Sequence, residues 1–120
     1  MTQAVVATLD GRVGEQLVAE LEGEGLVVSW VSDGLAALEA AADAGSIAFV
    51  EVDLPIFDGL EFAARVRADP DFSSNFPIIL ISGRDVEPHA LERAGISHVL
   101  PKTHTAQDVR ELLSRFLYQF

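Results

Sequence analysis

One stretch of the sequence decides the fold class, Ile47-Ala48-Phe49-Val50-Glu51-Val52-Asp53-Leu54-Pro55-Ile56-Phe57-Asp58-Gly59. It begins with a short apolar run, Ile47–Val52, in which apolar and polar residues hardly alternate. Such a run predicts a strand that is covered on both faces, as in a parallel sheet. The stretch ends in Asp58-Gly59, a pair typical of the start of a helix. A strand that leads within a few residues into a helix is the repeating unit of an α/β protein.

The same unit recurs along the 120 residues on both sides of this stretch. Further strands are expected at Ala4–Leu9, Leu26–Val31, Pro77–Ser82 and Ser97–Leu100. Helices are expected at Val13–Leu21, Leu35–Ala42, Leu60–Val66, His89–Ala94 and Val109–Phe116. Repeated strand–helix units predict right-handed crossovers and helices on both faces of the sheet. We therefore expect a single domain over residues 1–120, a flavodoxin-like doubly wound (βα)5 fold whose five-stranded parallel sheet has the order 2-1-3-4-5.

Local signals mark several helix ends. Asp33 is the expected N-cap of the second helix. The fourth helix is expected to begin at Pro88, which fits only a first turn, with Asp85 or Glu87 near the cap. Gly95 is expected to close this helix. The resulting helix has about two turns and is marginal without packing.

Composition excludes several classes of function. The sequence has no cysteine, so disulfides, thiolate zinc sites and catalytic thiols are excluded. Its formal net charge of −11 disfavours direct binding to nucleic acid or to anionic membranes. No signal peptide is visible, and the longest charge-free stretch, of 12 residues, is too short to cross a bilayer. The expected location is the cytoplasm.

Polar residues gather where the predicted strands end. In a doubly wound sheet, ligands and catalytic groups collect at the carboxyl ends of the strands. The residues expected there are Thr8, Leu9, Asp10, Glu51, Asp53, Ser82, Gly83, Arg84, Lys102 and Thr103. A carboxylate, a hydroxyl and an amine that converge at this edge would suit a phosphoryl group or a mimic of one. The three histidines, His89, His98 and His104, lack metal-ligand spacing and are expected at surface or edge positions.

Five strings in order carry a family resemblance: Leu21–Val28, Ser32–Leu38, Ile47–Phe62, Phe76–Gly83 and Ala94–Lys102. From Ala4 to about Leu117 the chain resembles the receiver domain of two-component response regulators. The third string is similar to the family's strand, acceptor Asp, three residues, Pro, two residues and Asp-Gly. The resemblance implies a signalling domain that receives a phosphoryl group from a histidine kinase or a phosphotransfer protein, with the help of magnesium.

The chain departs from the family pattern at the reacting groups. Counting back from the Pro and the Asp-Gly pair places Glu51 at the phosphoacceptor position. Thr8 and Leu9 occupy the places of the family's two magnesium-binding acidic residues, and Asp10 lies one place later. Because Leu9 offers no oxygen and Thr8 only a neutral one, we expect magnesium binding to be weak or absent, with no metal site.

Other positions keep the family's residue types. Ser82 matches the switch residue and Lys102 the phosphate-contacting lysine, whereas Val99 stands at the aromatic-switch position. The Glu51 carboxylate projects about 1.5 Å further than that of an aspartate, because it has one more carbon–carbon bond. We therefore expect its oxygens to meet Lys102 and the Ser82 hydroxyl, where phosphoryl oxygens would otherwise lie.

The expected function is that of an atypical receiver domain, a pseudo-receiver. Such a domain is not an enzyme, needs no cofactor and acts through protein partners: a histidine kinase, a phosphotransfer protein or a downstream effector. The resemblance implies that helix 4, strand 5 and helix 5 form the signalling face, which could also serve for a homodimer. Two alternatives remain, a phosphorylatable receiver that uses Asp53 or Asp10 as acceptor, and a small-molecule-binding flavodoxin-like module.

Overall fold

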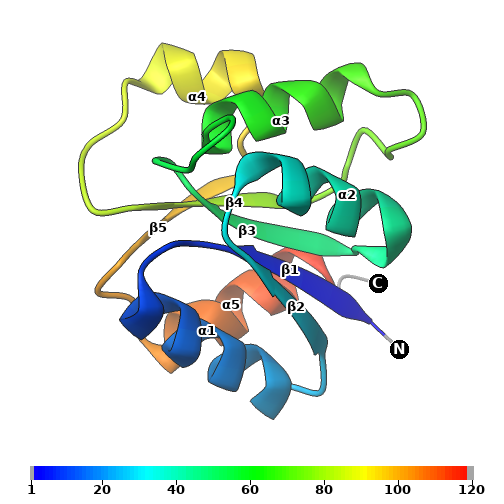
Figure 1. Ribbon diagram of the computed structural model, residues 1–120. Helices are drawn as coiled ribbons and strands as arrows, with labels where there is room; N and C mark the ends of the chain where they lie inside the picture. Colours follow the sequence, from blue (N-terminus) through cyan, green and yellow to red (C-terminus); the bar gives the residue numbers. More distant parts are fainter. Residues whose placement is uncertain (1, 119–120) are drawn as a thin grey trace.

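The computed structural model describes residues 2–118, in which five strands alternate strictly with five helices (Figure 1). The strands are β1 (Gln3–Ala7), β2 (Val27–Val31), β3 (Ile47–Glu51), β4 (Ile78–Ser82) and β5 (His98–Pro101). The helices are α1 (Gly11–Gly23), α2 (Gly34–Ala44), α3 (Gly59–Ala68), α4 (Pro88–Ala94) and α5 (Ala106–Phe116). All strand pairs are parallel, and the sheet order is β2-β1-β3-β4-β5. The predicted flavodoxin-like fold is confirmed.

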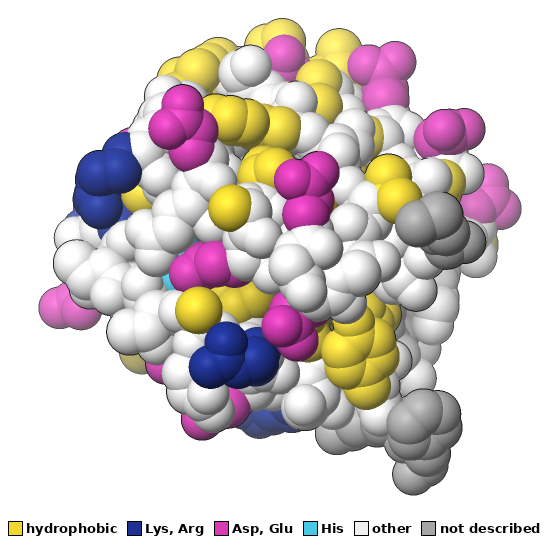
Figure 2. Space-filling view, turned by 90° about the horizontal axis from the view of Figure 1, so that it is seen from below, with side chains coloured by type: hydrophobic (Ala, Val, Ile, Leu, Met, Phe, Trp, Pro, Cys, Tyr) yellow, Lys and Arg dark blue, Asp and Glu magenta, His cyan; other side chains and the backbone are white. Residues whose placement is uncertain are grey.

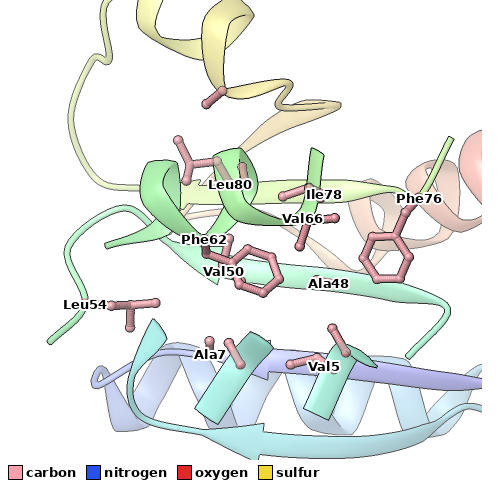
Figure 3. Close-up of a cluster of buried hydrophobic side chains, with 14 of the residues drawn as sticks. Val5, Ala7, Ala48, Val50, Leu54, Phe62, Val66, Phe76, Ile78 and Leu80 are labelled. Atoms are coloured by element: carbon pink, nitrogen blue, oxygen red, sulfur yellow. The ribbon is translucent and has the colours of Figure 1, made fainter. Parts of the chain in front are cut away.

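Helices cover both faces of the sheet. α1 and α5 lie on one face and α2, α3 and α4 on the other (Figure 1). Successive side chains of a strand point to opposite faces, so Val50 joins one buried cluster and Phe49 the other. Figure 3 shows the cluster beneath α2 and α3, where Phe62 and Val66 of α3 lie over the strands. Burial on both faces explains why the central strands read as continuous apolar runs.

The edge strand β2 departs from that expectation. Val27 is 39% exposed and Trp30 is 43% exposed, because β2 has a strand neighbour on one side only. The Trp30 indole lies against Gly14 of α1, where a Cβ atom would come within 2.1 Å of the ring. The indole N–H also donates to the carbonyl oxygen of Thr8, at 3.2 Å. Through Trp30, the edge strand β2 thus contacts and stabilises the loop that follows β1.

Three helices begin at the positions that their predicted N-cap residues indicated. Asp33 and Asp58 cap α2 and α3. Glu87, rather than Asp85, caps α4, which begins at Pro88. The left-handed Gly95, with φ of 77°, closes α4 as expected.

The predicted first strand was too long. β1 ends at Ala7, and Leu9 is 60% exposed instead of lying in the sheet. The chain leaves the strand here because the Thr8 hydroxyl accepts the N–H of Asp10, at 3.0 Å. The Asp10 carboxylate in turn caps α1 by accepting the N–H groups of Arg12 and Val13.

Candidate functional site

Four polar side chains meet at the carboxyl ends of β1, β3 and β5. Thr8 follows β1, Glu51 is the last residue of β3, Lys102 follows β5, and Asp10 is the N-cap of α1. β1 and β3 are neighbours in the sheet, whereas β5 lies two strands away from β3. The lysine therefore has to span the width of β4, which its long flexible stem allows.

Both oxygens of the Glu51 carboxylate are engaged. The Lys102 ammonium lies 3.3 Å from Oε2 of Glu51. The hydroxyl of Thr8 donates to Oε1 of Glu51. Thr8 and Glu51 are both buried, at 1% and 7% exposure. The carboxylate is thus held from two sides, by a positive charge and by a neutral donor.

Asp10 provides a second carboxylate beside the same ammonium. Its Oδ2 lies 3.5 Å from Nζ of Lys102, while its Oδ1 accepts the two N–H groups at the start of α1. The backbone N–H of Val13 and the positive charge of Lys102 lower the pKa of Asp10. Burial would lower the pKa of Lys102, but the hydrogen bond and charge of Glu51, with the charge of Asp10, raise it.

The side chains at this place do not fit magnesium. The Leu9 side chain has no oxygen, and the Thr8 hydroxyl already donates to Glu51. The two carboxylates that remain share the ammonium of Lys102, which occupies the position between them. Magnesium requires near-octahedral oxygen ligation. Among residues 2–118, no group of three or more His, Asp or Glu side chains is arranged to hold a metal ion.

Ser82 does not join this cluster, contrary to the expectation that its hydroxyl would meet Glu51. The Ser82 hydroxyl donates to the carbonyl oxygen of Arg84 and accepts the N–H of Arg84 at 3.1 Å. The chain turns directly after β4, so the nearest partners of the hydroxyl are backbone groups two residues on. The Arg84 guanidinium extends outward to Asp53, at 3.0 Å, in an exposed pair.

Val99 and Lys102 line a hollow beside Ser82. The hollow has a volume of about 300 Å³ and is also lined by Gly83, Arg84, Asp85, Pro101 and Thr103. Val99 is half-buried and packs against the cluster on the α2, α3 and α4 side of the sheet.

The comparison with known families agrees with the resemblance found in the sequence. Residues 10–114 match the response regulator receiver domain. The chain belongs to this family. Among curated proteins, it is 37% identical over 78 residues to the uncharacterized transcriptional regulatory protein YkoG of Bacillus subtilis. That match covers 64% of this chain and 33% of YkoG, so the chain spans about a third of this relative.

Solved receiver structures share the fold over nearly the whole chain. A putative response regulator from Chloroflexus aurantiacus superposes with a TM-score of 0.88 at 25% identity, covering 98% of both chains. The chemotaxis response regulator CheY4 of Vibrio cholerae gives a TM-score of 0.87 at 21% identity, covering 98% of this chain and 99% of CheY4. None of the helices of this receiver domain between residues 2 and 118 is long and apolar enough to span a bilayer.

The burial of one polar residue of the receiver domain, His104, was not predicted from the sequence. His104 was expected at a surface or edge position, but its side chain is fully buried against α1. Its Nε2 lies 2.8 Å from Oε1 of Glu20. No sequence signal could have revealed this contact, because the two residues are 84 positions apart.

Proposed function

We propose that this receiver domain is a pseudo-receiver that signals in one fixed state, without phosphorylation. The observation that carries the proposal is the contact of Lys102 with Glu51, at 3.3 Å. In the receiver pattern, these two residues stand at the phosphate-contacting and acceptor positions. The negative charge that phosphorylation would supply to the lysine is already provided by the glutamate.

The chemistry of phosphoryl transfer is poorly supported at this site. Transfer needs an acceptor oxygen free to attack and a cation that stabilises the charge spreading over the phosphoryl oxygens. Both oxygens of Glu51 have partners, and the carboxylates at hand do not fit magnesium. Asp53 is exposed and pairs with Arg84, and Asp10 caps α1. Each alternative acceptor would have to give up an existing contact.

The proposed activity is protein–protein interaction, and the proposed partner is a histidine kinase, a phosphotransfer protein or a downstream effector in the cytoplasm. The face proposed for it comprises α4, β5 and α5. On this face, His98, Asp108, Glu111 and Arg115 line a hollow of about 270 Å³. The chain as a whole carries a formal net charge of −11. On the α1 side of the molecule, seen in Figure 2, Asp and Glu side chains are spread over the surface and Lys and Arg are few. This distribution disfavours nucleic acid and anionic lipid as direct partners.

Incubation with acetyl phosphate and magnesium, followed by intact-mass measurement, tests the proposal. We expect no phosphoryl adduct on the wild-type domain. The matched control is the triple variant Thr8→Asp, Leu9→Asp and Glu51→Asp, which restores the acidic groups of the family and should gain some adduct. An adduct on the wild type that maps to Asp53 or Asp10 would overturn the proposal in favour of a phosphorylatable receiver. A co-purified small molecule bound stoichiometrically would instead favour a ligand-binding module.

A further inference from the structure

His104 sits outside the Glu51 site but next to the turn that carries Lys102. Its side chain is fully buried, with Nε2 2.8 Å from Oε1 of Glu20 and Nδ1 3.2 Å from the carbonyl oxygen of Pro101. Both neighbours are hydrogen-bond acceptors. Either neutral form of the ring donates to one of them, and the protonated ring donates to both. The imidazole thus links β5 to α1.

The same residue closes the turn after β5. The backbone N–H of His104 donates to the carbonyl oxygen of Pro101, at 3.1 Å. Lys102 and Thr103 are the two central residues of this turn. The backbone from which the Lys102 side chain starts is therefore held by two contacts of His104, one from its amide and one from its ring.

α1 holds this turn at two points along its length. Gln16 donates its side-chain amide to the carbonyl oxygen of His104, at 3.2 Å, and also to Glu20. At the start of the same helix, Asp10 contacts the ammonium of Lys102. Figure 1 shows the β5–α5 connection passing beside α1. The helix thus fixes both the backbone of the turn and the tip of its lysine.

We propose that His104, held by Glu20, is a positioning residue that keeps the Lys102 ammonium between Glu51 and Asp10. A lysine side chain has several rotatable bonds, so a fixed starting point reduces the number of conformers that compete with the paired one. The inference deepens the proposed function, since it concerns the lysine on which the fixed state rests. It assigns a role to the one buried histidine of the described chain.

The sequence offers a direct probe, because Lys102 is its only lysine. A domain labelled with ¹⁵N-lysine gives a single side-chain ammonium signal, whose titration reports the pKa of Lys102. The rate of acylation at Lys102, read by peptide mass mapping, is a second readout. The variants are His104→Phe, which keeps a ring without nitrogen, Glu20→Ala, and His104→Gln, which keeps an amide donor near the place of Nε2. His98→Phe is the matched control, because His98 lies on β5 beside Phe116, away from the turn.

We expect His104→Phe and Glu20→Ala each to lower the pKa of Lys102 toward that of an ordinary lysine and to speed its acylation. His104→Gln should retain part of the wild-type behaviour, and His98→Phe should retain all of it. Should His104→Phe fail to fold, Glu20→Ala must produce the same shift. An unchanged Lys102 titration in folded His104→Phe or in Glu20→Ala would overturn the positioning role. That outcome is distinct from a phosphoryl adduct on the wild type, which would overturn the proposed function and leave this role intact.

Discussion

The Lys102 ammonium lies 3.3 Å from the Glu51 carboxylate, and the two side chains are 29% and 10% exposed. The pair joins the ends of two strands that are not neighbours in the sheet. The burial of Glu51 makes the contact matter energetically, because a buried charge without its partner is costly. Removing the positive charge of Lys102 is therefore the first test of the site.

Lys102→Met should destabilise the domain by about 2 kcal/mol, since it keeps the apolar stem but leaves the Glu51 charge without its cation. Urea unfolding followed by circular dichroism measures the change. Arg84→Gln is the matched control, because it breaks an ion pair whose side chains are 57% and 69% exposed. The control should cost less than about 1 kcal/mol. Equal effects of the two variants would contradict the importance given to the buried pair.

The stabilisation from Lys102 should disappear at high pH. Burial would lower the pKa of Lys102, but the neighbouring carboxylates, mainly Glu51, raise this pKa in the folded domain. A group with a raised folded pKa contributes its full stability below its unfolded pKa, about 10.4 for lysine, and loses it as the pH rises through the folded value. The difference in unfolding free energy between wild type and Lys102→Met should therefore be constant from pH 7 to about 9 and shrink above pH 10. A constant difference up to pH 11 would contradict this.

Magnesium should not raise the melting temperature of the wild-type domain at a few millimolar. A ligand stabilises a protein only in proportion to its occupancy of a site in the native state, and the oxygens near Lys102 already have partners. Thermal scans with and without magnesium test this, with the Thr8→Asp, Leu9→Asp, Glu51→Asp variant as the positive control. Saturable stabilisation of the wild type would show that Asp10 or Asp53 rebuilds a metal site.

α4 should open more readily than α5. Ala94 is the only buried residue of the seven in α4, whereas Val109, Leu112 and Leu113 of α5 are buried. α5 also begins with a capping box at Thr105. Few buried contacts imply a low free energy of local opening. Hydrogen exchange should therefore be faster over Pro88–Ala94 than over Ala106–Phe116, and equal protection would reject the prediction.

Ile56→Gly should stabilise the domain. Ile56 has a φ of 71°, and its side chain is 70% exposed. The left-handed conformation costs a residue with a Cβ atom roughly 1–2 kcal/mol, and the greater chain entropy of glycine offsets about 0.5–1 kcal/mol of the gain. A net increase of up to about 1.5 kcal/mol is expected from these two values. Thermal unfolding measures it, with Ile56→Val as a control that keeps the branched side chain and should change little.

Several features followed from the sequence alone because they depend on neighbouring residues. The alternation of apolar runs with helical segments predicted the doubly wound fold, and the strand order expected for it, 2-1-3-4-5, is the one observed. Caps such as Asp33, Asp58 and Gly95 were visible because a cap acts within three or four residues of its helix end. The place of Glu51 at the end of its strand followed from counting along one short motif.

The tertiary structure alone decided which side chains meet. Lys102 does reach Glu51, as expected, but Asp10 shares its charge and Thr8 holds the other carboxylate oxygen. The Ser82 hydroxyl instead bonds to the backbone of Arg84. His104, expected at a surface or edge position, is buried against α1. These outcomes depend on how strand ends and helix faces align across tens of residues, and on which rotamers the packing allows. A short window of sequence contains no information about this long-range alignment or about the rotamers that the packing allows.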